Sequence, residues 1–109
     1  MPTKHEINKR SASYQDYLIE SLKDSKRSAA YLDAALEEGD PELFLLALRN
    51  VASAKGGLLK ISKKTKLNRA NLYRMLSRKG NPEFFSLESI LEALGLRLAV
   101  EVRTAKKAA

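Results

Sequence analysis

Apolar residues recur every three or four positions along most of this chain, a spacing that predicts a series of amphipathic helices. The first predicted helix begins near Tyr14, and a second covers about residues 25–38. Gly39 then suits the left-handed position that ends a helix. The first half of the chain is therefore predicted to be helical.

A third helix is predicted to begin at Asp40-Pro41, because aspartate caps free N–H groups and proline fits the first helical turn. This helix extends to Gly56-Gly57 and is the expected core helix. The residues predicted to face inward are Leu43, Phe44, Ala47, Leu48, Val51 and Ala52.

Two short helices joined by a tight turn are predicted next. The first covers about 58–65, Lys66-Leu67 forms the turn, and Asn68 caps the second. Leu72, Met75 and Leu76 are spaced to hold the second helix on the scaffold. After a loop at 80–82, a helix capped by Ser86 is expected to run to Gly95.

The period changes to two over residues 96–102, which predicts a β-strand. Four apolar side chains point one way along it: Leu96, Leu98, Val100 and Val102. A lone strand leaves backbone groups unpaired, so it needs a partner. Pairing with its symmetry mate in a homodimer is our first hypothesis; packing within the chain or pairing with another protein are the alternatives.

The length of 109 residues suits one domain, predicted over 14–104, with a flexible tail at 1–13 and a frayed tail at 105–109. The fold class is all-α, with five to six helices and one C-terminal strand. The net charge of +7 is uneven: residues 1–54 hold 7 basic and 9 acidic groups, and residues 55–109 hold 13 and 4. A polyanion would bind the second half.

Between Lys55 and Pro82 the chain has nine lysines and arginines and no acidic residue. This charge, together with the two short helices, predicts a DNA-binding helix-turn-helix. Arginine and asparagine form bidentate hydrogen bonds with guanine and adenine. The candidates for base reading are Arg69, Asn71 and Arg74.

The candidates for positioning on phosphates are Lys63, Lys64, Asn68, Tyr73, Arg78 and Lys79. Asn68 has an equally good structural role as a helix cap. Tyr73 suits a phosphate or a thymine methyl group, with packing as the alternative.

The sequence gives little indication of catalysis, metal binding or membrane insertion. The chain has no cysteine, and its one histidine, His5, lies in the predicted tail, so no enzyme, metal site or cofactor is expected. No apolar run approaches the roughly 20 residues of a membrane helix, and the N-terminus lacks the apolar core of a signal peptide. A cytoplasmic protein is the expectation.

The segment Ser62–Arg74 is similar to the Cro/C1-type (XRE) repressor helix-turn-helix, which implies a lambda-repressor-like fold. Lys66 departs from the many members that have glycine in this turn. The resemblance extends to four further segments: residues 31–40, the stretch Leu72–Ser77, Gly80-Asn81-Pro82 and Leu94-Gly95-Leu96. Over about 14–102 the chain resembles the probable addiction-module antidote family, the HigA-type antitoxins.

This resemblance implies a dimeric antitoxin that binds a RelE/HigB-like RNase toxin and represses its own operon at a double-stranded DNA operator. Acidic residues of the first half are the candidates for binding a basic toxin: Asp33, Glu37 and Glu38. The main alternative is a stand-alone or prophage-type repressor without a toxin. A third is a protein-interaction module whose helix-turn-helix no longer binds DNA.

Overall fold

The computed structural model describes residues 4–104, with side chains described from residue 13, and all regular structure in this range is helical. This confirms the predicted all-helical class. The elements are α1 (Lys4–Ser21), α2 (Ser25–Glu38), α3 (Pro41–Ala54), α4 (Gly57–Thr65), α5 (Arg69–Met75) and α6 (Phe84–Ala93).

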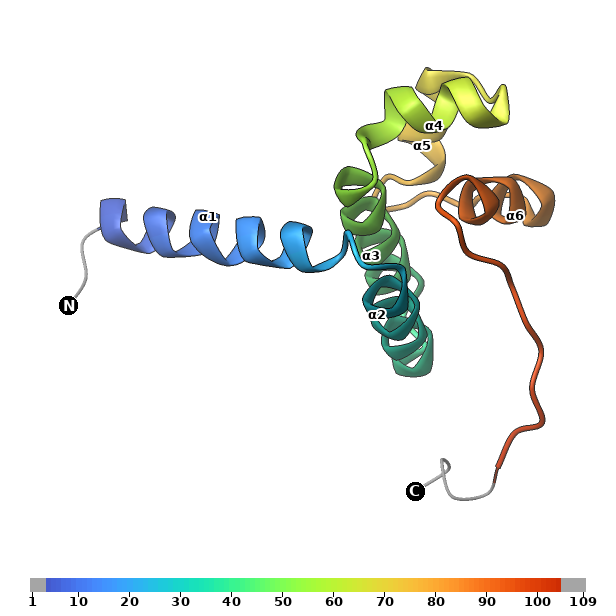
Figure 1. Cartoon of the computed structure of the whole chain (residues 1–109), viewed down its shortest axis with the longest axis horizontal. Coiled ribbons are helices and arrows are strands. Elements are labelled where there is room, and N and C mark those ends of the chain that lie inside the picture. Colours follow the sequence, from blue (N-terminus) through green and yellow to red (C-terminus); the bar gives the residue numbers. More distant parts are fainter. Residues whose placement is uncertain (1–3, 105–109) are drawn as a thin grey trace.

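Helix α3 is the centre of the arrangement (Figure 1). It packs along α2 and also contacts α1 and α4, and α4 in turn contacts α5 and α6. Helix α1 projects to one side of the α2–α3 pair, whereas α4 and α5 lie together at one end. The largest fully buried side chains of the core include Leu22, Leu48, Val51, Ile61, Leu72, Leu76 and Ile90.

Local capping explains where α2 and α3 begin and end. Gly39 adopts φ 74° and donates its N–H to the Leu36 carbonyl, as predicted for the residue that ends α2. Asp40 then accepts a 3.0 Å hydrogen bond from the Glu42 N–H, with Pro41 in the first turn of α3. The predicted inward position of Leu43 is wrong: Leu43 is exposed and Leu45 is buried.

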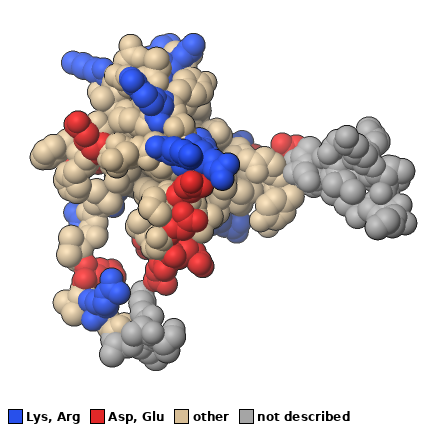
Figure 2. Space-filling view, turned by 180° about the vertical axis from the view of Figure 1, so that it is seen from behind, with Lys and Arg blue, Asp and Glu red and all other residues tan. Residues whose placement is uncertain are grey.

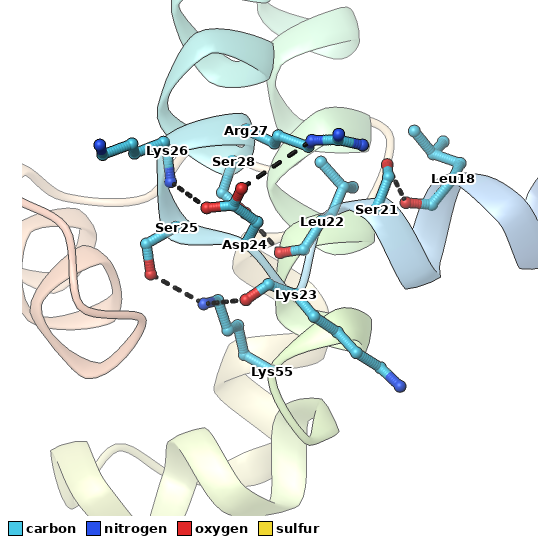
Figure 3. A network of polar contacts seen from close by, with 10 residues as sticks. All are labelled: Leu18, Ser21, Leu22, Lys23, Asp24, Ser25, Lys26, Arg27, Ser28 and Lys55. Atoms are coloured by element: carbon cyan, nitrogen blue, oxygen red, sulfur yellow. Dashed lines mark hydrogen bonds and ion pairs between the residues drawn. The ribbon is translucent and has the colours of Figure 1, made fainter.

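A polar network fixes the corner between α1 and α2 (Figure 3). The buried Ser28 hydroxyl donates a 2.6 Å hydrogen bond to the Leu22 carbonyl. From beyond the end of α3, the Lys55 ammonium donates 2.9 Å hydrogen bonds to the Lys23 carbonyl and the Ser25 hydroxyl. The corner is thus tied to the residues that precede α4.

Helix α1 begins at Lys4, ten residues before the predicted start near Tyr14. Residues 4–13, assigned to a flexible tail by their lack of apolar periodicity, are helical. Residues 4–38 contain no glycine or proline. Intrinsic helix propensity can therefore extend the helix into residues 4–13, where no apolar periodicity indicates one. Residues 1–3 and the predicted frayed tail at 105–109 lie outside the described residues.

The predicted strand at 96–102 is absent: none of the described residues forms a β-strand. Instead, the segment after α6 continues as an irregular chain (Figure 1). A strand requires hydrogen bonds to a neighbouring strand, and no other part of the described chain supplies one. Helix α6 also begins at Phe84, two residues before the predicted cap Ser86.

Candidate nucleic-acid interface

The turn between α4 and α5 has the tight geometry of a helix-turn-helix. Lys66 ends α4 in the left-handed conformation, with φ 64°, and donates its N–H to the Ser62 carbonyl over 2.9 Å. Leu67 then donates its N–H to the Thr65 hydroxyl and packs against the core. Lys66 is the one non-glycine residue with a positive φ among the described residues.

Asn68 caps α5, as predicted. Its side-chain oxygen accepts hydrogen bonds from the N–H groups of Ala70 (2.8 Å) and Asn71 (3.3 Å). These two bonds satisfy donors that the first turn of the helix would otherwise leave free. The structural role of Asn68 is therefore present; its contact with phosphate stays a prediction.

The inward face of α5 is held tightly. Leu72 and Leu76 are fully buried, and Met75 packs against the same core cluster. The guanidinium of Arg49, on α3, donates a hydrogen bond to the main-chain carbonyl of Leu76, at the end of α5. The orientation of α5 relative to α3 is thus fixed by apolar packing and by one charged donor.

The outward face of α5 presents the three base-reading candidates. Arg69, Asn71 and Arg74 are all exposed. The Arg74 guanidinium donates a hydrogen bond to the Asn71 side-chain oxygen, so two of the three are joined. Tyr73 is also exposed, which disfavours the packing role for its ring.

The positioning candidates around α5 are exposed too: Lys63 and Lys64 in the last turn of α4, and Arg78 and Lys79 after α5. Arg78 differs from the others because its guanidinium nitrogen lies 3.1 Å from the Glu42 carboxylate. Figure 2 shows blue side chains at the end of the molecule that holds α4 and α5, with red side chains farther down. The α4–α5 end is therefore rich in exposed basic side chains.

The three acidic candidates for protein binding lie on the exposed surface of α2. Asp33 and Glu37 line a groove of about 730 Å³ between α2 and the segment after α6, whereas Glu38 does not. The apolar residues Ala29, Leu32, Leu36 and Phe44 line it from the helical side.

The segment after α6 forms the other wall of this groove, which is lined by Leu96, Arg97, Leu98, Ala99, Glu101 and Val102 but not by Val100. Leu96 and Leu98 pack against the core, but Val100 is 100% exposed and Val102 is 91% exposed. The four apolar positions that sequence alternation grouped together are thus split between two that are half-buried and two that are exposed.

Two residues important for this surface were missed by the sequence analysis. Arg49 was one basic residue in an acidic half of the chain, and nothing local linked it to Leu76, 27 positions away. Gly80 was assigned only to a loop, yet a Cβ there would collide with the main-chain carbonyls of Met75 and Arg74. The close approach of this loop to α5 requires glycine.

Comparison of the sequence with known protein families identifies one family. A family model described as "Probable addiction module antidote protein" matches residues 13–102. An uncharacterized protein of Haemophilus influenzae is 33% identical over 84 residues, which are 77% of this chain and 86% of that protein. No solved structure matches the chain significantly. None of the described helices is long and apolar enough to cross a membrane.

Proposed function

The chain belongs to the probable addiction module antidote family, and from that premise we propose that it is the antitoxin of a type II toxin–antitoxin module. In this proposal it neutralises a protein toxin by direct binding and represses its own operon through α4 and α5. The antidote description supports a toxin partner. The proposed repressor activity rests on the geometry of the second half of the chain.

The observation that carries the repressor proposal is the exposed face of α5. It combines Arg69 with the bonded pair Asn71 and Arg74, on a helix anchored to the core by Leu72 and Leu76. Major-groove recognition needs forked donors and acceptors on a rigid helix. The turn at Lys66 supports a Cro/C1-type (XRE) helix-turn-helix.

The likeness to HigA-type antitoxins makes a RelE/HigB-like RNase toxin the proposed partner. An enzyme that cleaves RNA needs a basic surface to attract phosphates. The acidic residues of α2 are of opposite charge, so Asp33, Glu37 and Glu38 stay the proposed contacts. Dimers of this fold class read two half-sites about one helical turn apart, so we propose that the antitoxin acts as a homodimer.

The experiment that tests the repressor is fluorescence anisotropy with the DNA upstream of its own gene and with a scrambled duplex, across a salt series. We expect preference for the upstream DNA and a steep salt dependence, with a slope of about −0.9 per phosphate contact. Equal affinity for both duplexes contradicts the repressor proposal.

The toxin proposal is tested with the protein encoded by the adjacent gene. Co-expression with the tagged neighbour should yield a stable complex and restore growth that the neighbour alone arrests. A stand-alone repressor would bind its operator in the first experiment and fail both parts of this one.

A further inference from the structure

The segment after α6 has a pattern that the single chain does not use. Leu96, Leu98, Val100 and Val102 alternate with Arg97, Ala99 and Glu101, yet only Leu96 and Leu98 pack against the core. Val100 and Val102 are both exposed, and Val102 lines the groove. The segment also has no neighbouring strand for its backbone N–H and C=O groups within residues 4–104. Exposing the two valines to water is unfavourable, and so is leaving the backbone groups of a strand-forming segment without a partner strand.

We propose that a second copy of this chain covers the groove. Residues 96–102 of the two copies pair as a two-stranded antiparallel ribbon centred on Ala99. This inference rests on the proposed function for one point, that the antitoxin is a homodimer. It adds the interface, the strand register and the side chains that fill the groove.

Charge complementarity selects this register. With Ala99 on the twofold axis, Arg97 of each copy lies opposite Glu101 of the other, which gives two opposite-charge pairs. A register centred on Val100 would instead place Arg97 opposite Arg103, two like charges. A register shifted by one residue would set Arg97 opposite Val100 and mix charged and apolar side chains on one face.

The same register explains the groove. Directly opposite residues of antiparallel strands lie on the same face. Leu98 therefore meets Val100 of the second copy, and Leu96 meets its Val102. Because Leu96 and Leu98 face the helical core, the two valines of the second copy enter the groove beside them, against the apolar surface that includes Leu36 and Phe44. Each copy fills the groove of the other.

The first test is a charge reversal measured by analytical ultracentrifugation of the full chain. Arg97→Glu alone and Glu101→Arg alone each replace two attractive pairs by two repulsive ones, and we expect each to weaken dimerisation roughly tenfold or more. The double variant Arg97→Glu/Glu101→Arg restores both pairs in reverse and should recover the wild-type dimer. Arg103→Glu is the matched control: it changes charge as Arg97→Glu does but faces Gly95 in this register.

The second test uses the absence of cysteine from the sequence. In the proposed register the two Ala99 Cα atoms lie about 4.5–5.5 Å apart, within the reach of a disulfide. Ala99→Cys should therefore oxidise to a covalent dimer, whereas Thr104→Cys should not, because its two positions are about 33 Å apart along the ribbon. Circular dichroism verifies that both variants fold.

The outcomes separate this interface from the proposed function. Rescue by the double reversal, with crosslinking at position 99 alone, supports the ribbon. A dimer that binds operator DNA but neither crosslinks at position 99 nor responds to Arg97→Glu overturns the ribbon and leaves the repressor intact. If the Ala99→Cys variant is a monomer whose new thiol is protected only by the product of the adjacent gene, the groove belongs to the toxin, which also overturns the proposal.

Discussion

The guanidinium of Arg49 donates a hydrogen bond to the main-chain carbonyl of Leu76, the residue that ends α5. Arg49 lies on the core helix α3, so this bond joins the scaffold to the C-terminal end of the proposed recognition helix. The carbonyls in the last turn of a helix have no partner within it, and a cation there is favourable. Arg49 is therefore a positioning residue for α5, although it does not itself lie on the exposed face.

Replacing Arg49 by alanine should lower the free energy of unfolding by about 1.5–3 kcal/mol, the usual range for a hydrogen bond to a charged group. It should also weaken operator binding, because α5 loses one of its fixed ends. Urea denaturation and anisotropy measure the two effects. Lys23→Ala, which removes an exposed ion pair with Glu20, is the control and should change stability by less than about 1 kcal/mol. Equal, small effects of both variants contradict the role of Arg49.

Asn68 allows its capping role to be separated from contact with DNA. Asn68→Ala removes the two hydrogen bonds to the first turn of α5 and should cost about 0.5–2 kcal/mol. Asn68→Asp keeps the cap but places a negative charge at the surface proposed to face phosphates. We expect it to keep near wild-type stability in thermal denaturation while weakening DNA binding. An aspartate variant that binds DNA as well as wild type excludes the phosphate contact.

The left-handed conformation of Lys66 should cost stability. A residue with a Cβ is disfavoured there by about 1–2 kcal/mol, and glycine is not, although glycine loses more entropy on folding. Lys66→Gly should therefore raise the free energy of unfolding by up to about 1 kcal/mol. Lys66→Ala removes the same charge while keeping the strain, so it should show no such gain. If both variants behave alike in urea denaturation, the backbone conformation is not the cause.

Gly80 is predicted to be intolerant of any side chain. A Cβ at this position would meet the main-chain carbonyl of Met75, and backbone cannot move aside as a flexible side chain can. Gly80→Ala should destabilise the fold by at least about 2 kcal/mol. Gly39→Ala is the matched control: nothing lies within 4 Å of its Cβ, so only the left-handed φ of 74° opposes it, at about 1–2 kcal/mol. A smaller loss at Gly80 than at Gly39 would contradict the close approach.

Local signals predicted much of this structure, whereas contacts distant in sequence were not visible. Asp40 and Asn68 were identified as caps because the capping oxygen and its N–H partners lie within three residues. The contact between Arg49 and Leu76 joins residues 27 positions apart, so no window of sequence contains it. The prediction of a strand at 96–102 was wrong for a different reason. Alternation of apolar and polar residues identifies a segment that can form a strand, but not the partner strand that it needs.

The hydrogen bond between Asn71 and Arg74 predicts that these two base-reading candidates act as a unit. The bond fixes the Arg74 guanidinium beside the Asn71 amide before DNA is bound, so removing either side chain also releases the other. Asn71→Ala and Arg74→Ala should each cost about 1–3 kcal/mol of discrimination between operator and scrambled DNA. The double variant should cost clearly less than their sum, as for residues that share one network. Arg69 supplies the control, because no such bond to its α5 neighbours is seen among the described side chains. Arg69→Ala should therefore add its full cost in binding free energy to that of either variant. Additivity of all three substitutions, measured by anisotropy at one salt concentration, would show that Asn71 and Arg74 contact DNA independently.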